Sequence, residues 1–360
     1  MNAIMPSDQP VLDIRNLYVE YLTEQGPVRA VENVSFSIAP GEVFGLAGES
    51  GCGKSTIAHT ILRVLRPPAV VTGGKILYKG IDILQMEGTA LDEYRKKVLA
   101  TPERKEINPS DDLIETFRWA EVSMVFQSAM NSLNPVIKVV DQIIDVLITH
   151  ENIDRKQARK RAEELMEVVN IDKRRLDAYP HELSGGMRQR VVIAIALALK
   201  PSLMIMDEPT TALDVVVQKD ILQQIDQLKK EYGFSILFIT HDLSLMVEFS
   251  DRIGIMYAGE LVELASAQEI LTKPYHPYTK GLLSSFPSIS GARTKLTGIP
   301  GAPPNLLTPP KGCRFHPRCP EWDGAETDTS PVLEEVTPGH WVACSCAKAN
   351  AAASAGTRTA

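Results

Sequence analysis

The chain has 360 residues, of which 44% are hydrophobic and 23% are charged, a composition that excludes a fibrous repeat or a chain disordered throughout. Its 38 Lys and Arg against 45 Asp and Glu give a net charge of −7, which argues against a general nucleic-acid binder. At about 150 residues per domain, the length predicts roughly two domains.

The first part of the chain predicts two paired strands, a third strand and a helix. Apolar and polar residues alternate over 11–21 and 30–38, as in half-buried paired strands. Residues 42–47 predict a short apolar strand, and 54–65 predict a helix after a glycine-rich stretch. The charged, irregular segment 87–118 is expected to be a surface insertion.

The second part alternates helices and strands. Residues 139–170 show helical periodicity with many charges, and 191–199 continue a further helix. Residues 203–206 and 235–240 are short apolar runs typical of buried strands. Strands that alternate with helices predict an α/β fold with a mainly parallel sheet covered on both faces.

Residues 48–55 read Gly-Glu-Ser-Gly-Cys-Gly-Lys-Ser and satisfy the pattern G-x-x-x-x-G-K-[ST] between a predicted strand and a predicted helix. Glycines allow successive backbone N–H groups to point at one anion, and the start of the helix adds a partial positive charge. This context predicts that Lys54 contacts the β- and γ-phosphates of a nucleotide and that Ser55 holds Mg²⁺. A glycine-rich turn without function is the alternative. Cys52 would contribute only its backbone amide.

The apolar run 203–206 ends in Asp207 and Glu208. A strand buried on both faces would carry Asp207 to the Mg²⁺ ion beside the phosphates, and Glu208 could then polarise a water molecule. Two acids after an apolar run could also form a simple turn. The phosphate motif upstream favours the metal and base roles.

The segment 183–190, Leu-Ser-Gly-Gly-Met-Arg-Gln-Arg, makes nearly the whole chain resemble the nucleotide-binding subunit of ABC transporters. The resemblance implies a P-loop NTPase fold with a RecA-like core, an N-terminal antiparallel β subdomain and an α-helical subdomain at about 128–190. In that family the residues matching Ser184, Gly185 and Gly186 contact the γ-phosphate bound by the opposite subunit. A helix start is a second anion site, which makes sense when two subunits face each other head to tail.

The resemblance implies roles for other residues as well. It assigns Gln127 to sensing Mg²⁺ and the membrane partner, Asp214 to contact with the other subunit, His241 to the γ-phosphate, and Tyr21 to stacking on adenine. An isolated tyrosine in a strand would otherwise be ordinary packing. The expected set is catalytic Lys54, Gln127, Glu208 and His241; nucleotide-binding Tyr21, Gly48, Ser50, Gly51, Cys52, Gly53, Lys54, Ser55, Thr56, Ser184, Gly185, Gly186 and Asp214; and Mg²⁺-binding Ser55, Gln127 and Asp207.

The proline-rich C-terminal segment narrows the resemblance. Prolines after residue 271 disfavour a long helix or a central strand. Residues 274–279 and 299–320 closely resemble the tail of oligopeptide and dipeptide importer ATPases, a tail shared by relatives that serve nickel and certain oligosaccharides. The implied division is an ABC ATPase domain at 1–275, a small irregular C-terminal domain at 276–346, and a tail at 347–360 that is expected to be disordered.

Four of the five cysteines lie in this segment, at Cys313, Cys319, Cys344 and Cys346. The cytosol disfavours disulfides, and four thiolates could bind zinc or an iron–sulfur cluster, although the spacing matches neither zinc ribbons nor bacterial ferredoxins. Dipeptide-type relatives hold a [4Fe-4S] cluster here, which the resemblance therefore implies. Their usual third cysteine is replaced by Glu326, so Cys346 would substitute. Zinc and four reduced thiols are the alternatives.

No segment is long enough to cross a membrane, because the longest apolar run is 191–199 and a span needs about 20 residues. The N-terminus lacks the basic and apolar segments of a secretory signal. We therefore expect a peripheral protein at the cytoplasmic face of the cell membrane.

Together these features predict the ATPase subunit of an ABC importer for oligopeptides, dipeptides or a related small solute, with ATP and Mg²⁺ as cofactors. The implied partners are a second, homologous ATPase subunit in a heterodimer, two transmembrane permease subunits and an extracytoplasmic solute-binding protein, and no nucleic acid. The alternative is a soluble ABC-type ATPase acting on nucleic acid or ribosomes. The single phosphate motif, the acidic balance and the lack of a heptad run argue against it. A redox sensor would rest only on the cysteines.

Overall fold

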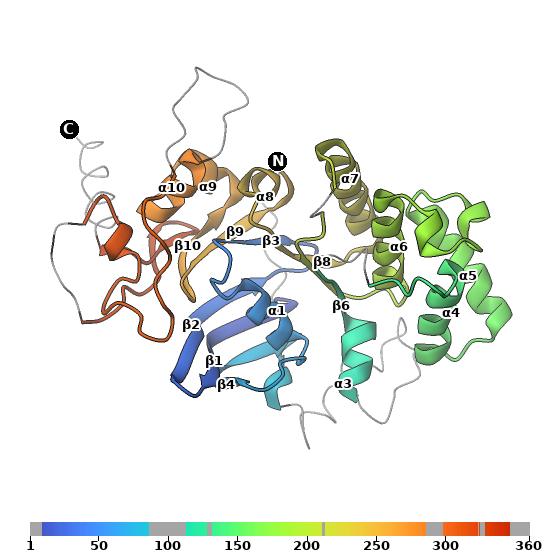
Figure 1. Ribbon diagram of the computed structural model, residues 1–360, viewed down its shortest axis with the longest axis horizontal. Coiled ribbons are helices and arrows are strands. Elements are labelled where there is room, and N and C mark those ends of the chain that lie inside the picture. The colour runs from blue at the N-terminus through green and yellow to red at the C-terminus, as the bar shows by residue number, and fades with distance from the viewer. Residues whose placement is uncertain are drawn as a thin grey trace. The chain divides into compact units, whose positions relative to one another are not determined.

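The computed structural model describes residues 9–85, 113–127, 132–210, 213–285, 298–322, 324 and 328–345. The chain forms two compact units, each built from segments that are distant in the sequence (Figure 1). The first comprises Met1–Asp13, Ser37–Glu42 and Ile76–Leu237, and the second comprises Ile14–Phe36, Val43–Lys75 and Phe238–Ala360. Among the described helices, none combines the length and the apolar composition that a membrane span needs.

The first unit contains a parallel pair of strands. β6 (Val122–Val125) and β7 (Leu203–Asp207) run parallel as neighbours. Every residue of β7 is buried, which explains why the strand is a continuous apolar run and does not alternate. β8 (Ser235–Ile239), which begins in this unit, is equally buried. The strands predicted from these two apolar runs are therefore confirmed.

The helices of the first unit that gather around α6 are α4 (Val139–His150), α5 (Arg155–Val168), α6 itself (Gly185–Leu197) and α7 (Val215–Tyr232). The helical pattern over 139–170 is two helices and not one. Asp154 begins the second of them, because its side chain accepts from the main-chain N–H of Gln157 while the Gln157 side chain bonds back to Asp154.

The segment before β6 differs from the expected surface insertion. Most of residues 87–118 lie outside the described residues, but the end of the segment forms α3 (Leu113–Thr116) and a wide helical turn (Phe117–Glu121). Phe117 is fully buried, and its ring meets that of Tyr78 edge-on at a centroid distance of 5.2 Å. This aromatic contact holds the end of the segment in the core as the chain enters β6.

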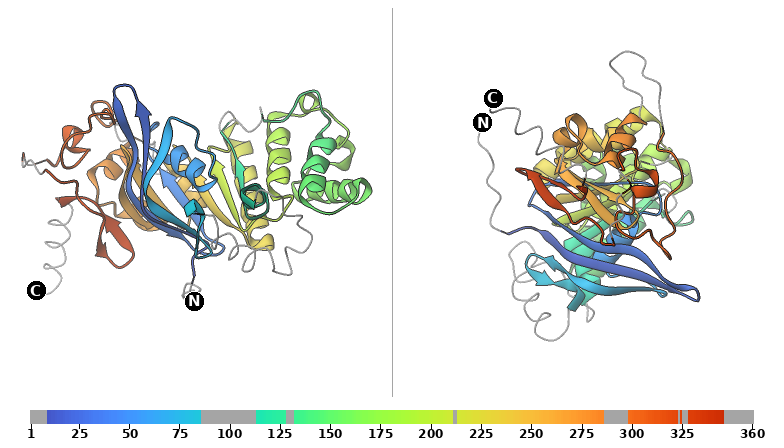
Figure 2. Two further views of the ribbon diagram at one scale, coloured as in Figure 1. Left: turned by 90° about the horizontal axis from the view of Figure 1, so that it is seen from below. Right: turned by 90° about the vertical axis from the view of Figure 1, so that its left-hand side faces the viewer.

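In the second unit, the strand before the phosphate motif belongs to a sheet that the C-terminal segment extends. β3 (Val43–Ala47) runs parallel to β9 (Arg252–Tyr257), which turns back antiparallel into β10 (Glu260–Ser266). β12 (His340–Val342) and β11 (Glu334–Thr337) continue the sheet in the order β3-β9-β10-β12-β11, and appear in red in Figure 2. The proline-rich segment thus supplies short edge strands and, as expected, no long helix.

A second sheet consists of β1 (Leu12–Thr23), β2 (Gly26–Ile38), β4 (Ala69–Tyr78) and β5 (Ile81–Asp82). Its strand order is β2-β1-β4-β5, and most of its residues belong to the second unit. The predicted paired strands at 11–21 and 30–38 correspond to β1 and β2. The α-helices in the described part of the second unit are α1 (Lys54–Ile61), α8 (Leu243–Phe249), α9 (Ala267–Thr272) and α10 (Pro277–Ser284).

A fully buried carboxylate, that of Glu263 in β10, anchors the start of the C-terminal segment. It accepts hydrogen bonds from the main-chain N–H groups of Tyr275 at 2.7 Å and His276 at 3.0 Å. The ring nitrogen Nε2 of His340 in β12 also lies 2.7 Å from it. A buried carboxylate needs several such partners, and here they tie β10, the chain before α10 and β12 together.

His276 caps α10, and its Nδ1 accepts a hydrogen bond from the main-chain N–H of Tyr278 at 3.0 Å. The side chain is fully buried, and this burial lowers the pKa of His276 from 6.5 to about 4, against the opposing effect of the Glu263 charge. The folded protein therefore keeps this imidazole neutral under conditions in which the unfolded chain protonates it.

We expect the free energy of unfolding to fall as the pH drops from 6.5 toward 4, because only the unfolded chain binds the His276 proton in that range. The decline should amount to roughly 3 kcal/mol in total. His276→Asn keeps a capping acceptor and should flatten this decline in denaturant titrations at several pH values. His181→Asn, at an exposed site, should change nothing. An undiminished decline in His276→Asn would contradict the assignment.

Candidate functional site

The predicted phosphate loop, residues 48–53, connects β3 to α1, and its shape depends on glycine at two positions. Gly48 and Gly53 have φ angles of +152° and +104°. A Cβ atom would lie 2.2 Å from the main-chain oxygen of Met256 at Gly48, and 2.2 Å from that of Ala30 at Gly53. Because the obstructing atoms belong to the backbone, only glycine fits at either position without a shift of the main chain.

Lys54 folds back over the loop that precedes it. Its Nζ donates to the main-chain oxygens of Gly48 at 2.8 Å and Glu49 at 3.0 Å, and lies 3.5 Å from Sγ of Cys52. Burial raises the pKa of the Cys52 thiol despite the opposing effect of Lys54, so this thiol stays protonated at neutral pH. A protonated thiol agrees with the expectation that Cys52 is no nucleophile.

Tyr21 of β1 lies beside the first turn of α1, as Oη of Tyr21 is 3.3 Å from Oγ1 of Thr56. Ser55 stands next to Thr56 in the same turn. The structure therefore brings Tyr21 to the helix that follows the phosphate loop. Its stacking on adenine stays a prediction, as does the contact of the exposed His241, which follows β8 in the second unit, with a γ-phosphate.

In the first unit, two predicted catalytic residues meet where neighbouring parallel strands end. Gln127 follows β6 and Glu208 follows β7, and Nε2 of Gln127 donates to Oε2 of Glu208 at 2.9 Å. Carboxyl ends of parallel strands share one edge of a sheet, which explains the meeting. Asp207, just before Glu208, is buried, whereas Glu208 itself has a φ of +48°, a left-handed conformation that strains a residue with a Cβ.

The predicted signature residues begin α6 in the same unit. Ser184 is the N-cap and accepts from the main-chain N–H of Met187 at 3.3 Å, with Gly185 and Gly186 as the first residues of the helix. A Cβ on Gly186 would lie 2.9 Å from Cγ1 of Val217 in α7. Asp214 caps α7 by accepting from the N–H of Val217 at 3.0 Å. The signature residues and Asp214 therefore lie side by side.

The C-terminal cysteines gather only in part. Burial raises the pKa of Cys313 to about 11, and nearby charges on Cys344 and Cys319 add to the effect, so the three thiols share one neighbourhood. Even so, the described residues contain no group of three or more Cys, His, Asp or Glu side chains arranged to hold a metal ion. Cys346 and Glu326 lie outside the described residues. The described thiols alone thus do not complete a cluster site.

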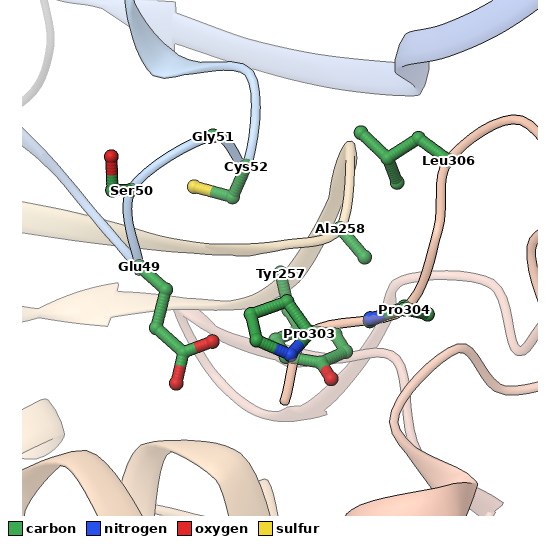
Figure 3. Close-up of a pocket in the computed structure, with 9 residues that line it drawn as sticks. All are labelled: Glu49, Ser50, Gly51, Cys52, Tyr257, Ala258, Pro303, Pro304 and Leu306. Atoms are coloured by element: carbon green, nitrogen blue, oxygen red, sulfur yellow. The ribbon is translucent and has the colours of Figure 1, made fainter. Parts of the chain in front are cut away.

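Sequence reasoning missed one feature of the site, the contact between the C-terminal segment and the phosphate loop. The hydroxyl of Tyr278 accepts from the main-chain N–H of Glu49 at 3.0 Å, and Arg318 binds the Glu49 carboxylate. Pro303 and Pro304 also approach the loop (Figure 3). No pattern in the sequence singled out Arg318, because other charged residues, among them Lys311, Arg314 and Glu321, lie in the same proline-rich run.

The chain matches two protein-family models. One is described as ABC transporter and covers residues 31–211, and the other is described as the C-terminal region of oligopeptide/dipeptide transporters and covers 262–324. The dipeptide transport ATP-binding protein DppD of Bacillus subtilis is 41% identical over 93% of this chain and 92% of its own length. The oligopeptide transport ATP-binding protein OppD of Escherichia coli is 39% identical over 93% and 92%.

Solved structures resemble the fold as well. A dimeric ATP-binding cassette in a post-hydrolysis state, bound to ADP and Pi, is 27% identical to this chain with a TM-score of 0.58. The match covers 71% of this chain and 98% of that one. It therefore concerns the cassette and leaves a substantial part of this chain unmatched.

Gly53→Ala should weaken nucleotide binding by at least about tenfold, because the new Cβ would displace the loop whose amides are predicted to bind phosphate. Gly51→Ala is the matched control. Its Cβ would meet nothing within 4 Å, so only the φ of +79° opposes it and a smaller loss is expected. Titration with a fluorescent ADP analogue and Mg²⁺ measures both. Equal losses in the two variants would show that the close backbone approach is not decisive.

Proposed function

Because this chain belongs to the ABC transporter family, in its oligopeptide/dipeptide branch, we propose that it powers the uptake of oligopeptides, dipeptides or a related small solute by hydrolysing ATP. The family match over 262–324 supports this cargo class, since that region is described from oligopeptide and dipeptide transporters. The relatives named above are dipeptide and oligopeptide transport proteins. Nickel and oligosaccharides remain the rival cargoes.

The hydrogen bond between Gln127 and Glu208 carries the catalytic part of the proposal. Glu208 orients or deprotonates the attacking water, and the amide of Gln127 holds the carboxylate in place until it is needed. Lys54 and the loop amides neutralise phosphate charge, and His241 contacts the transferring phosphoryl group. The strained backbone of Glu208 is typical of residues that a fold holds in one orientation for function.

The donor set proposed for the metal fits Mg²⁺. Ser55 offers a hydroxyl oxygen, Gln127 an amide oxygen and the buried Asp207 a carboxylate, all of them hard oxygen ligands of the kind this ion prefers. Mg²⁺ bound there would withdraw charge from the β- and γ-phosphate oxygens. The chain's own contribution is to fix these oxygens on a strand end and on the first turn of α1.

The proposed partners follow from exposed and half-buried residues of the first unit. The ATP site of a second, homologous ATPase subunit would be completed by Ser184, Gly185, Gly186 and Asp214. The start of α6 is a second place where an anion can bind, and this chain already has a phosphate loop for its own nucleotide. Phe126, Val136 and Ile137 expose apolar side chains around and beyond Gln127, with Val136 78% exposed. We assign this apolar surface to one of two permease subunits.

In the assembled importer the chain would lie at the cytoplasmic face of the membrane, below the permeases and opposite the solute-binding protein. The domain division at residue 275, with the helical subdomain at about 128–190, belongs to the same proposal. A soluble ABC-type ATPase acting on nucleic acid or ribosomes is less well supported, because the C-terminal family match is to a region of transporters.

Glu208→Gln should leave nucleotide binding nearly unchanged and lower ATP turnover of the assembled complex by roughly a hundredfold or more, since Gln cannot act as a base. Phosphate release measures the turnover. Glu231→Gln makes the same chemical change at an exposed position near the end of α7 and should keep the wild-type rate. If turnover survives in Glu208→Gln, Glu208 is not the base.

The cysteines of the C-terminal segment add a separate proposal, a [4Fe-4S] cluster on Cys313, Cys319, Cys344 and Cys346. Its support is the sequence resemblance and the shared neighbourhood of the three described thiols. No catalytic step depends on it. A cluster at this position would serve the structure or the redox response of the C-terminal domain.

Full-length protein purified without oxygen should contain iron and acid-labile sulfide in about equal amounts. Cys313→Ser should remove both, whereas Cys52→Ser, which changes the cysteine outside this segment, should retain them. Elemental analysis decides the matter. Stoichiometric zinc, or no metal at all, would contradict the cluster.

A further inference from the structure

Glu49, the second residue of the phosphate loop, is held through three of its groups. Its main-chain oxygen accepts from Nζ of Lys54, and its main-chain N–H donates to Oη of Tyr278 at 3.0 Å. Its carboxylate accepts from both terminal nitrogens of Arg318, at 2.9 and 3.0 Å. Tyr278 and Arg318 both belong to the C-terminal segment, so two of these three contacts come from outside the nucleotide-binding core.

The guanidinium of Arg318 is bonded on every side. Its Nε donates to the main-chain oxygen of Pro300 at 2.8 Å, and its terminal nitrogens reach the main-chain oxygen of Ile299 at 3.4 Å and Oη of Tyr257 at 3.3 Å. The Arg318 side chain is only 6% exposed. A cation buried to this degree needs a paired anion, and Glu49 supplies it in a two-pronged geometry.

The chain around Arg318 also packs against the loop. A cavity of about 30 Å³ separates loop residues 49–52 from Pro303, Pro304 and Leu306 (Figure 3). The phosphate loop and the C-terminal segment therefore line the same small cavity. Proline restricts the backbone on the C-terminal side, which makes that side the stiffer partner.

A phosphate loop binds nucleotide through its main-chain N–H groups. Its affinity for the nucleotide therefore depends on the fraction of molecules in which those N–H groups point at the same phosphate. Glycine-rich backbone is costly to order, and a contact that orders it before the nucleotide arrives strengthens binding. We propose that the C-terminal domain holds the phosphate loop in its nucleotide-binding shape through the Arg318–Glu49 ion pair, with Arg318 as a positioning residue. The inference rests on the proposed role of residues 48–55.

The coupling works in both directions. If docking of the C-terminal domain strengthens nucleotide binding, a bound nucleotide strengthens that docking by the same free energy. The candidate cysteine site includes Cys319, the next residue after Arg318. Any change that moves this part of the domain would therefore reach the phosphate loop through the Arg318–Glu49 ion pair.

Arg314 provides a matched control within the same segment. Its side chain is 3% exposed, and its guanidinium pairs with Glu32 and Glu260 and donates to the main-chain oxygen of Ala258. Neither acidic partner belongs to the phosphate loop. Loss of Arg314 should therefore cost stability, as loss of Arg318 does, without releasing Glu49.

The test compares Arg318→Met, Arg314→Met and wild type as full-length chains, by titration with a fluorescent ADP analogue and Mg²⁺ and by thermal unfolding. Both variants should unfold at lower temperature. Only Arg318→Met should bind nucleotide more weakly, by about tenfold. Glu49→Gln should weaken binding in the same direction, and the double variant Glu49→Gln with Arg318→Met should cost no more than Arg318→Met alone, because both remove one interaction.

Two outcomes overturn the proposal: equal weakening in Arg314→Met and Arg318→Met, or an affinity of Arg318→Met within about twofold of wild type. If Arg318→Met yields no folded protein, Glu49→Gln removes the same ion pair from its more exposed side, and an unchanged affinity there overturns the proposal as well. Lys54→Ala distinguishes a failure of the Arg318–Glu49 proposal from a failure of the proposed function. Wild-type nucleotide affinity in Lys54→Ala would mean that residues 48–55 are not the phosphate site.

Discussion

The close approach of backbone to backbone around the phosphate loop is the constraint on which the site depends. Gly48 and Gly53 each lie so near a main-chain oxygen, of Met256 and Ala30 respectively, that no side chain fits between them. The loop is thereby held between β9 and the strand that contains Ala30, and Lys54 is directed back across it. An anion site made of amides needs such support, because the amides carry no affinity unless they converge.

Local patterns predicted much of this molecule from its sequence. The phosphate loop was recognisable from its closely spaced glycines, and β7 from an apolar run that ends in Asp207 and Glu208. Each of these patterns lies within a few consecutive residues. Contacts between distant residues left no such trace. The bond between Gln127 and Glu208 depends on β6 and β7 being neighbours, and the burial of Phe117 depends on a ring contact with Tyr78.

The C-terminal segment shows the same limit more clearly. Its prolines predicted short, irregular structure, but nothing in the sequence indicated that β12 would pair with β10 or that Glu263 would anchor both sides of the junction. The segment is connected to the phosphate loop, because the buried guanidinium of Arg318 pairs with the carboxylate of Glu49. Family resemblance identified the segment, and only the structure gave it a physical connection to the nucleotide site.

The ATPase rate of the complete importer in lipid vesicles, with and without its solute-binding protein loaded with a peptide, tests the central claim most directly. An ATPase that drives peptide uptake should hydrolyse ATP several times faster when the loaded binding protein is present. Closure of the two ATPase subunits on ATP is coupled to the conformation of the permeases, which the loaded binding protein changes. A rate that is insensitive to peptide, in a complex that nonetheless hydrolyses ATP, would contradict the account.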